Sequence, residues 1–255
     1  MNKIEIYILN ENEIKVARDT TMFAARITQH GHEIKSIDDL KKLYNKPYKE
    51  STFDTINKLP HPNIQELNKI NIVIYGSSRR VLSQLTRAHE SKFVSASLQY
   101  STYGNDADFV VPYDILGNDD LIKKYLESCK NSMNNYIELN KLNVDNDSCG
   151  YTSPAGLRNI LLISATPAQF KHLISQRSCK RNTKETQYVI LKIWEALYNI
   201  DNVMFNSEVT GPFCMQSNCK EGKMSCGKPI KKGLTPSEII KIEFPKLYKE
   251  NINES

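Results

Sequence analysis

The sequence contains no long apolar run, few cysteines and no strong excess of charge of either sign. No stretch of about 18 or more apolar residues occurs, so the sequence predicts no transmembrane helix. The first residues, from Met1 to Glu5, lack the apolar core and small-residue cleavage site of a signal peptide. Together these absences favour a cytoplasmic protein with no membrane partner.

The six cysteines are too few for the dense disulfide framework of a small secreted protein, so reduced thiols are expected. Cys214, Cys219 and Cys226 lie in a glycine-containing segment near the end, and Cys179 lies upstream. Their spacing lacks the Cys-x-x-Cys knuckle that most structural zinc sites contain. Zinc or an iron–sulfur cluster is an alternative for this group, but we expect no metal site.

The charge balance is mildly basic. Thirty-four Lys and Arg residues against 29 Asp and Glu residues give a net charge of +5. This excess is far below that of a strongly basic nucleic-acid binder, so we expect no nucleic-acid partner. It suits small anions, particularly phosphates. The chain shows no internal repeat, and its length of 255 residues fits a single domain.

Alternating apolar and polar residues predict the first strands. Ile4, Ile6 and Ile8 mark one strand, and a second runs from Ile70 to an end at Gly76. Further strands are expected over residues 109–115 and 160–163. Helices are expected over residues 20–27, 37–44 and 119–139, then as a pair after residue 166 and near the end, with loops over 45–62 and 140–150. This order indicates an α/β (α+β) fold, a mixed sheet with flanking helices.

The segment 77–89 contains a basic stripe. Ser77 or Ser78 is placed to cap a helix directly after the strand. Arg80, Gln84 and Arg87 follow at spacings of four and three, which places them on one helical face. Two guanidinium groups and an amide suit a phosphate or a planar heterocycle. The alternative is a solvated basic face without a ligand.

A row of small polar residues follows over residues 93–101. Ser95, Ser97, Gln99 and Ser101 alternate with apolar residues, so an extended segment places three hydroxyls and an amide on one face. Such a row can bind the oxygens of an anion. The alternative is the outward face of an amphipathic strand.

Two helix starts are predicted by capping boxes, in which side chains at the first and fourth positions exchange hydrogen bonds with the backbone. Thr166 with Gln169 forms the first, and Asn182 with Glu185 forms the second. Arg177 therefore lies near the end of one helix and just before the next, and its guanidinium could point into a cleft. The alternative is that Arg177 and Lys180 cap the end of the helix.

Together these segments resemble the flavin-dependent thymidylate synthases. That family has an Arg-His-Arg triplet followed seven residues later by a Ser, and here Arg87-Ala88-His89 is followed by Ser97 at that spacing. Gln84 matches the family's Gln before the triplet. The stretch from Arg177 to Glu185 reproduces an Arg-x-Cys-x-Arg-x-x-x-Glu pattern of some members, and the Cys-rich tail resembles one branch. The similarity spans about residues 21–227 of a single domain over 1–255, with a short lysine-rich tail.

The resemblance implies a reaction and a set of site residues. The expected reaction is reductive methylation of dUMP to dTMP, with FAD as cofactor and with NADPH and 5,10-methylenetetrahydrofolate as co-substrates. The expected assembly is a homotetramer with shared active sites. Arg177 matches the catalytic arginine that favours ionisation of the uracil N3. The nucleotide-binding positions are Gln84, Arg87, Ser95, Ala96, Ser97, Leu98, Gln99 and Arg177. The flavin-contacting positions are Asn63, Arg87, Ala88, His89, Ser95 and His172.

The chain departs from the family pattern at several of these positions. Ala88 and His89 alter the triplet, and Gln99 and Gly150 stand where the family has arginines. A related C5 alkylation of another pyrimidine nucleotide and a non-catalytic nucleotide- or flavin-binding paralogue are therefore the alternatives. Retention of Arg177 counts against the paralogue. The candidate replacements for the lost arginines are Arg80, Lys92 and Arg158.

Overall fold

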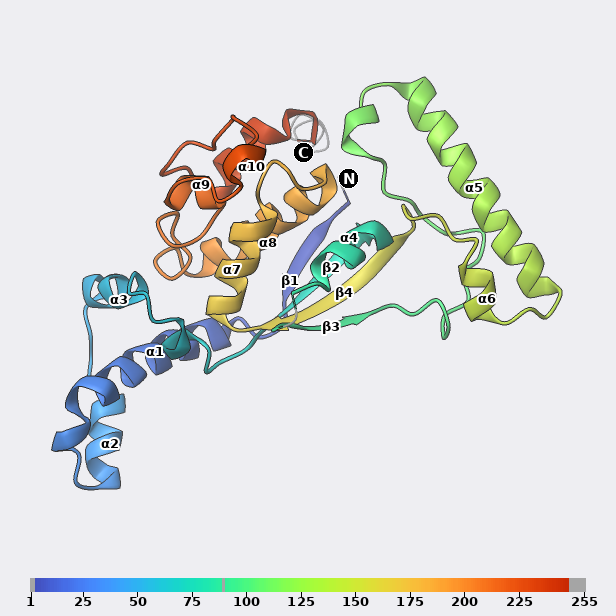
Figure 1. Ribbon diagram of the computed structural model, residues 1–255. Coiled ribbons are helices and arrows are strands. Elements are labelled where there is room, and N and C mark those ends of the chain that lie inside the picture. Colours follow the sequence, from blue (N-terminus) through green and yellow to red (C-terminus); the bar gives the residue numbers. More distant parts are fainter. Residues whose placement is uncertain (1–2, 89, 248–255) are drawn as a thin grey trace.

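The computed structural model describes residues 3–88 and 90–247 of the chain (Figure 1). The strands are β1 (Glu5–Ile8), β2 (Ile70–Ser78), β3 (Lys92–Ser95) and β4 (Arg158–Ala165). The α-helices are α1 (Asn12–His30), α2 (Ile37–Tyr44), α3 (Glu50–Asn57), α4 (Arg79–Leu85), α5 (Asp119–Lys141), α6 (Asn146–Gly150), α7 (Pro167–Arg177), α8 (Lys184–Ile200), α9 (Phe213–Gln216) and α10 (Pro236–Glu243). Short 3-10 turns are η1 (Gly31–Glu33), η2 (Pro62–Gln65), η3 (Tyr113–Ile115) and η4 (Gly222–Met224).

The four strands form one sheet in the order β1-β2-β4-β3. Each neighbouring pair is antiparallel, so Ile74 of β2 lies opposite Ile6 of β1 and Leu161 of β4. Helices packed on a sheet confirm the predicted fold class. The sequence predicts a mixed sheet, but the sheet is antiparallel, because each described strand runs opposite in direction to the strand beside it.

Strand β2 does not end at Gly76, as the sequence predicts, but passes through it with a shift of register between Tyr75 and Ser77. Gly76 has a backbone φ of +81°, an angle that residues other than glycine rarely adopt. A Cβ atom there would lie 2.5 Å from the main-chain oxygen of Lys3. The irregularity lets β2 continue to Ser78 and start α4 at once.

One face of the sheet is buried and the other is open. Ile72 and Ile163 on the inner face pack in one core with the α8 residues Ile190 and Trp194, all with no more than 1% exposure. On the outer face, registered neighbours form an apolar row across all four strands. This outer sheet row consists of Tyr7, Val73, Leu162 and Val94. Tyr7 is 63% exposed and Val94 is 66% exposed, whereas Val73 and Leu162 between them are half-buried, so the described part of the chain leaves the two ends of the row open.

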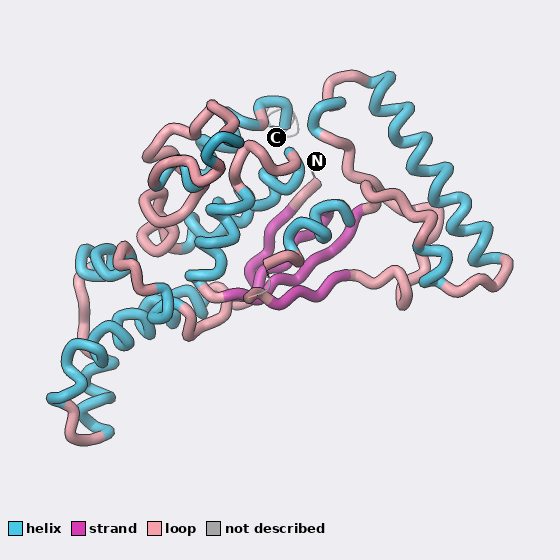
Figure 2. The backbone as a smooth tube through the Cα atoms, viewed as in Figure 1, coloured by secondary structure: helices cyan, strands magenta, loops and turns pink. Residues whose placement is uncertain are grey.

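The remaining helices extend the molecule on either side of the sheet (Figures 1 and 2). Helices α7 to α10 gather near the sheet, whereas α1 and α2 project to one side and α5 with α6 to the other. The α5–α6 arm has a small core of its own, including Met133, Tyr136 and Cys149. Among the described residues, no helix is both long and apolar enough to cross a membrane.

Several predicted elements need correction. The predicted loop 45–62 contains α3, which buries Phe53 completely and lies between the prolines rather than on them. The predicted strand 109–115 is wrong: Phe109 makes one isolated bridge to Leu157, and Pro112, which lacks an N–H, precedes the turn η3. The connection 140–150 contains α6, and the helix expected over 20–27 begins at Asn12. The helix over 37–44 is confirmed, with Ser36 as its cap.

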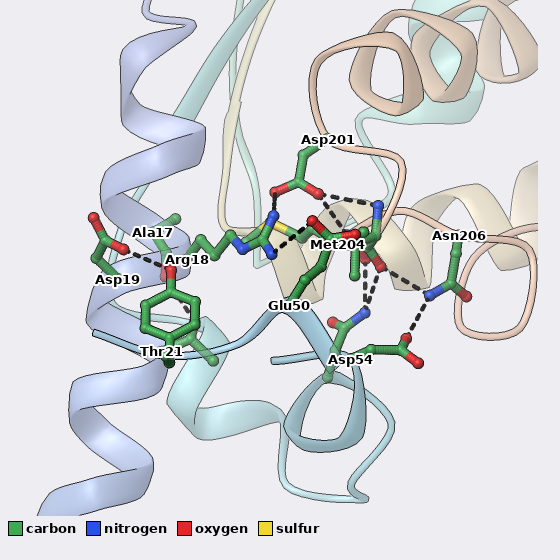
Figure 3. A network of polar contacts seen from close by, with 12 residues as sticks. Ala17, Arg18, Asp19, Thr21, Glu50, Asp54, Asp201, Met204 and Asn206 are labelled. Carbon is green, nitrogen blue, oxygen red and sulfur yellow. Dashed lines mark hydrogen bonds and ion pairs between the residues drawn. The ribbon is translucent and has the colours of Figure 1, made fainter. Parts of the chain in front are cut away.

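A polar network fixes α1 and α3 to the chain after α8 (Figure 3). The Arg18 guanidinium lies 3.2 Å from a carboxylate oxygen of Asp201 and 3.7 Å from one of Glu50. The other Asp201 oxygen accepts hydrogen bonds from the backbone N–H groups of Val203 and Met204. Asp201 therefore both pairs with the cation and caps the turn after α8.

Candidate active site

The polar row 95–99 lines an open pocket of about 640 Å³, here called the serine pocket. Its wall consists of Arg79, Ser95, Ala96, Ser97, Leu98, Gln99, Asp147, Gly150 and Tyr151. The structure thus brings five of the predicted nucleotide-binding residues into one cavity. It is large enough for a small organic ligand.

The row reaches the serine pocket as a turn rather than as a strand. Strand β3 ends at Ser95, and the Ser97 hydroxyl oxygen accepts hydrogen bonds from the backbone N–H groups of Gln99, at 3.1 Å, and Tyr100, at 3.4 Å. The expectation of an extended segment to residue 101 is therefore wrong. The physical reason is that a serine side chain competes with the sheet for backbone N–H groups.

Gly150 leaves room for the turn. A Cβ atom at this position would lie 3.3 Å from both Cβ and Cδ1 of Leu98. A larger side chain at 150 would therefore press on Leu98 unless one of them moved. The close packing of Leu98 fits the absence of a side chain at Gly150.

A second, smaller cavity gathers three of the predicted flavin-contacting residues. This histidine pocket of about 210 Å³ is lined by Arg87, Ala88, Glu90, Ser91, Gln169, His172, Leu173 and Gln176. The His172 ring nitrogen Nε2 lies 2.7 Å from Nε2 of Gln176. The pocket therefore combines a guanidinium, an imidazole and amides at the surface between α4 and α7.

The other flavin-contacting and nucleotide-binding positions lie elsewhere. Asn63 is exposed on η2 and lines neither pocket, and His89 lies outside the described residues. Gln84 is half-buried on α4 and also lines neither pocket. The predicted stripe of Arg80, Gln84 and Arg87 on one helix is wrong, because α4 ends at Leu85 and Arg87 follows in a turn.

Arg177 is the last residue of α7 and lines a third pocket, of about 460 Å³. This cysteine pocket is lined by Gln176, Arg177, Cys179, Lys180, Arg181, Asn182, Pro212, Phe213, Cys214, Cys219, Lys220, Glu221, Ser225, Cys226, Lys228 and Pro229. Gln176 also lines the histidine pocket, so the two cavities adjoin along α7.

The Arg177 side chain has spare donors. Its Nη1 lies 3.5 Å from Oδ1 of Asn182, and its buried Nε–H has no hydrogen-bond partner among the described residues. The end of α7 is satisfied otherwise, because the Ser178 N–H and hydroxyl both donate to the Ile174 oxygen. Lys180 pairs with Glu243 at 2.7 Å. Among the described residues, Arg177 donates to no carbonyl at the end of α7, so its guanidinium is available to a ligand.

The first capping box is confirmed and the second is wrong. Thr166 and Gln169 exchange both hydrogen bonds at the start of α7. Glu185 instead accepts from the backbone N–H of Ser78 at 2.7 Å and from its hydroxyl at 2.6 Å. Burial raises the pKa of Glu185, whereas these two bonds oppose the rise. Ser78 begins α4 without a side-chain cap, because its hydroxyl joins α4 to α8.

The four cysteines weighed as metal ligands all line the cysteine pocket. Burial raises the pKa of the Cys179 thiol, and the nearby Glu221 adds to this effect. No group of three or more His, Cys, Asp or Glu side chains within residues 3–88 and 90–247 is arranged to hold a metal ion.

None of the three candidate replacement cations lines the serine pocket. Arg158 is tied to Asp108 at 2.6 Å and to the Gly76 oxygen at 2.5 Å. Arg80 and Lys92 are exposed and line none of this pocket. Arg79 lines it instead. The sequence places Arg79 directly after the strand that ends at Ser78, but its contact with residues 95–99 depends on tertiary packing.

The chain matches the family model described as thymidylate synthase complementing protein over residues 12–201. A flavin-dependent thymidylate synthase from Geobacter sulfurreducens is 22% identical over 196 residues, which cover 75% of this chain and 82% of the relative. A flavin-dependent thymidylate synthase from Thermococcus onnurineus is 23% identical over 170 residues, covering 64% of this chain and 69% of the relative.

Solved structures share the fold at low identity. Thymidylate synthase X from Helicobacter pylori, crystallised with FAD and dUMP, has a TM-score of 0.60 and 17% identity, covering 80% of this chain and 97% of that one. The UMP/dUMP methylase PolB from Streptomyces cacaoi, bound with 5-Br dUMP, has a TM-score of 0.66 and 13% identity, covering 81% of this chain and 94% of that one.

Proposed function

Because the chain belongs to the family of flavin-dependent thymidylate synthases, we propose that it catalyses the FAD-dependent reductive methylation of dUMP to dTMP. We further propose 5,10-methylenetetrahydrofolate as the carbon donor and NADPH as the reductant. The observation that carries the proposal is the clustering of residues 95–99 in one pocket and of Arg87, Ala88 and His172 in another.

The histidine pocket fits part of a flavin. Arg87, His172 and Gln176 offer cationic, imidazole and amide groups suited to the polar edge or the phosphates of FAD. A volume of about 210 Å³ holds only a fraction of so large a molecule, so the remainder must lie on the surface or against a second copy of the chain. Bound FAD would supply the redox chemistry of the methylation.

The nucleotide requires an anion site and a group that activates the pyrimidine. The hydroxyls of the serine pocket suit the phosphate. Arg177 suits the activating role, because a permanent cation beside the developing negative charge on the uracil stabilises the anion without a proton transfer. The free donors of Arg177 support this assignment. Arg177 lines the cysteine pocket, which is separate from the serine pocket of the same chain. This separation favours an active site to which two copies of the chain contribute residues.

UMP is the second candidate substrate. The observation that favours it is the fold shared with a UMP/dUMP methylase, at the higher of the two TM-scores. Asp147 on the wall of the serine pocket adds a carboxylate able to accept a hydrogen bond from a ribose hydroxyl.

The test combines flavin binding and product formation. Purified protein is titrated with FAD while its absorbance is followed, and then incubated with NADPH, methylenetetrahydrofolate and either dUMP or UMP. We expect saturable FAD binding, bleaching of the flavin by NADPH, and methylated product from at least one nucleotide. A folded protein that binds no FAD would overturn the proposal. FAD and nucleotide binding without product under any condition would identify a non-catalytic paralogue.

A further inference from the structure

The wall of the serine pocket contains a single cationic side chain among the described residues. Arg79 is the one Arg or Lys among the described residues that line it, and Asp147 is the one carboxylate. A phosphate entering this pocket therefore meets one guanidinium, the hydroxyls of Ser95 and Ser97, and a carboxylate that repels further negative charge. Charge-assisted hydrogen bonds are roughly twice as strong as neutral ones, so the guanidinium dominates any grip on an anion.

Hydrogen bonds hold Arg79 in place, but they leave most of its guanidinium N–H groups without a partner among the described residues. Its backbone N–H donates to the Leu157 oxygen at 3.0 Å, and its Nη1 donates to the Ala96 oxygen at 3.3 Å. Among the described residues, no carboxylate forms an ion pair with Arg79. A guanidinium carries five N–H donors, so four stay available to a ligand.

The neighbouring hydroxyl is also oriented for an anion. The Ser97 oxygen accepts two backbone N–H groups, so its own hydrogen is free to donate. The hydrogen bond from Arg79 to the carbonyl of Ala96 holds the guanidinium against the short loop that carries this hydroxyl. The other candidate cation, Arg158, is occupied by Asp108 and the Gly76 oxygen.

We propose that Arg79 binds the phosphate of the nucleotide substrate and that the serine pocket accepts a single phosphate group. This assignment rests on the proposed function, since it names the residue that recognises the substrate of that reaction. In this chain the cation that binds the phosphate would thus come from the first turn of α4, and not from positions 99 and 150, where the family has arginines.

The test measures equilibrium binding of dUMP, UMP and the phosphate-free deoxyuridine to the flavin-loaded protein by calorimetry. Arg79→Ala should weaken dUMP binding by about ten- to a hundred-fold, the usual effect of losing a charged hydrogen-bonding partner. Deoxyuridine binding should stay unchanged. Arg80→Ala is the matched control, since it removes an exposed arginine from the next position, outside the pocket.

A rescue variant separates charge from folding. Gln99 lines the same pocket, so Arg79→Ala combined with Gln99→Arg should recover most of the dUMP affinity. Equal loss of dUMP and deoxyuridine affinity in Arg79→Ala, or no loss at all, would overturn the assignment while leaving the proposed function standing. If the wild-type protein binds neither dUMP nor UMP, the proposed function itself fails.

Discussion

At the scale of single residues, Arg177 combines a fixed position with unused donors. It ends α7, and its Nε–H is buried without a partner. Arg177→Ala should lower methylation by about 10²–10³-fold, the typical cost of losing one preorganised donor. Flavin reduction by NADPH should persist, because hydride transfer to the flavin needs no uracil anion. The two half-reactions are followed separately, by flavin absorbance and by product formation.

Two further variants sharpen the Arg177 test. Arg177→Lys should restore little, because a point charge does not reproduce the planar fork of a guanidinium. Arg181→Ala is the matched control from the same pocket, since Arg181 is engaged by Glu221 and the Met224 oxygen. Equal loss of flavin reduction and methylation in Arg177→Ala would make Arg177 a structural residue. If Arg177→Ala changed neither methylation nor flavin reduction, Arg181 would become the candidate for the catalytic arginine.

Lys171 is a buried amine whose charge state depends on pH. Burial lowers its pKa to about 7, and Asp201 opposes the shift. Its Nζ donates to Oδ1 of Asn57 and to Oε1 of Gln65, each at 2.5 Å. A neutral amine keeps two N–H donors, so both amide oxygens stay paired after deprotonation.

The free energy of unfolding should therefore rise with pH above about 7. Below that pH the folded chain bears the full cost of the buried ammonium of Lys171. Between about pH 7 and 10 the unfolded chain keeps this proton and the folded chain loses it, which adds at most about 1.4 kcal/mol per pH unit. Urea unfolding at pH 6.5 and 8.5 measures the rise, and Lys171→Met should lack it. The same pH dependence in both proteins would show that Lys171 titrates alike folded and unfolded.

At the scale of elements, the start of α7 depends on a local device. The buried Thr166 hydroxyl accepts the Gln169 N–H, and the Gln169 side chain accepts the Thr166 N–H. Thr166→Ala should cost about 1 kcal/mol, or roughly 2–4 °C in Tm for a chain of this size. Thr166→Ser keeps the hydroxyl and should stay near the wild type in a thermal melt. An unchanged Tm for Thr166→Ala would mean that packing of α7 alone fixes its start.

Local patterns predicted the elements whose causes are local. The alternation at Ile70, Ile72 and Ile74 and the caps at Ser36 and Thr166 each depend on neighbours within a few residues. The sequence predicts these features correctly, apart from the end of the strand. The second capping box failed because Glu185 finds its partner Ser78 across 107 residues. The same limit explains the site: the polar row at 95–99 was visible, whereas Arg79 reaches it only through the folded sheet.

At the scale of the whole molecule, the described residues leave both ends of the outer sheet row exposed. Tyr7, Val73, Leu162 and Val94 lie side by side in the strand register, and the two at the edges are mostly exposed. Apolar patches of this kind mark interaction surfaces. Arg177 and the polar row 95–99 line separate cavities of one chain. This separation gives a second reason to expect assembly, since an active site shared between chains needs a second copy.

The family resemblance implies a homotetramer, and we expect copies of the chain in it to cover one another's outer sheet row. Light scattering should give about four times the chain mass of 29.2 kDa. Val94→Asp places a charge in the row and should reduce the assembly and the turnover together, because burying an unpaired carboxylate is costly. Leu142→Asp is the matched control, at another exposed apolar residue, directly after α5. An intact tetramer in Val94→Asp would exclude this face as an interface, and a stable monomer that turned over substrate would contradict the shared site.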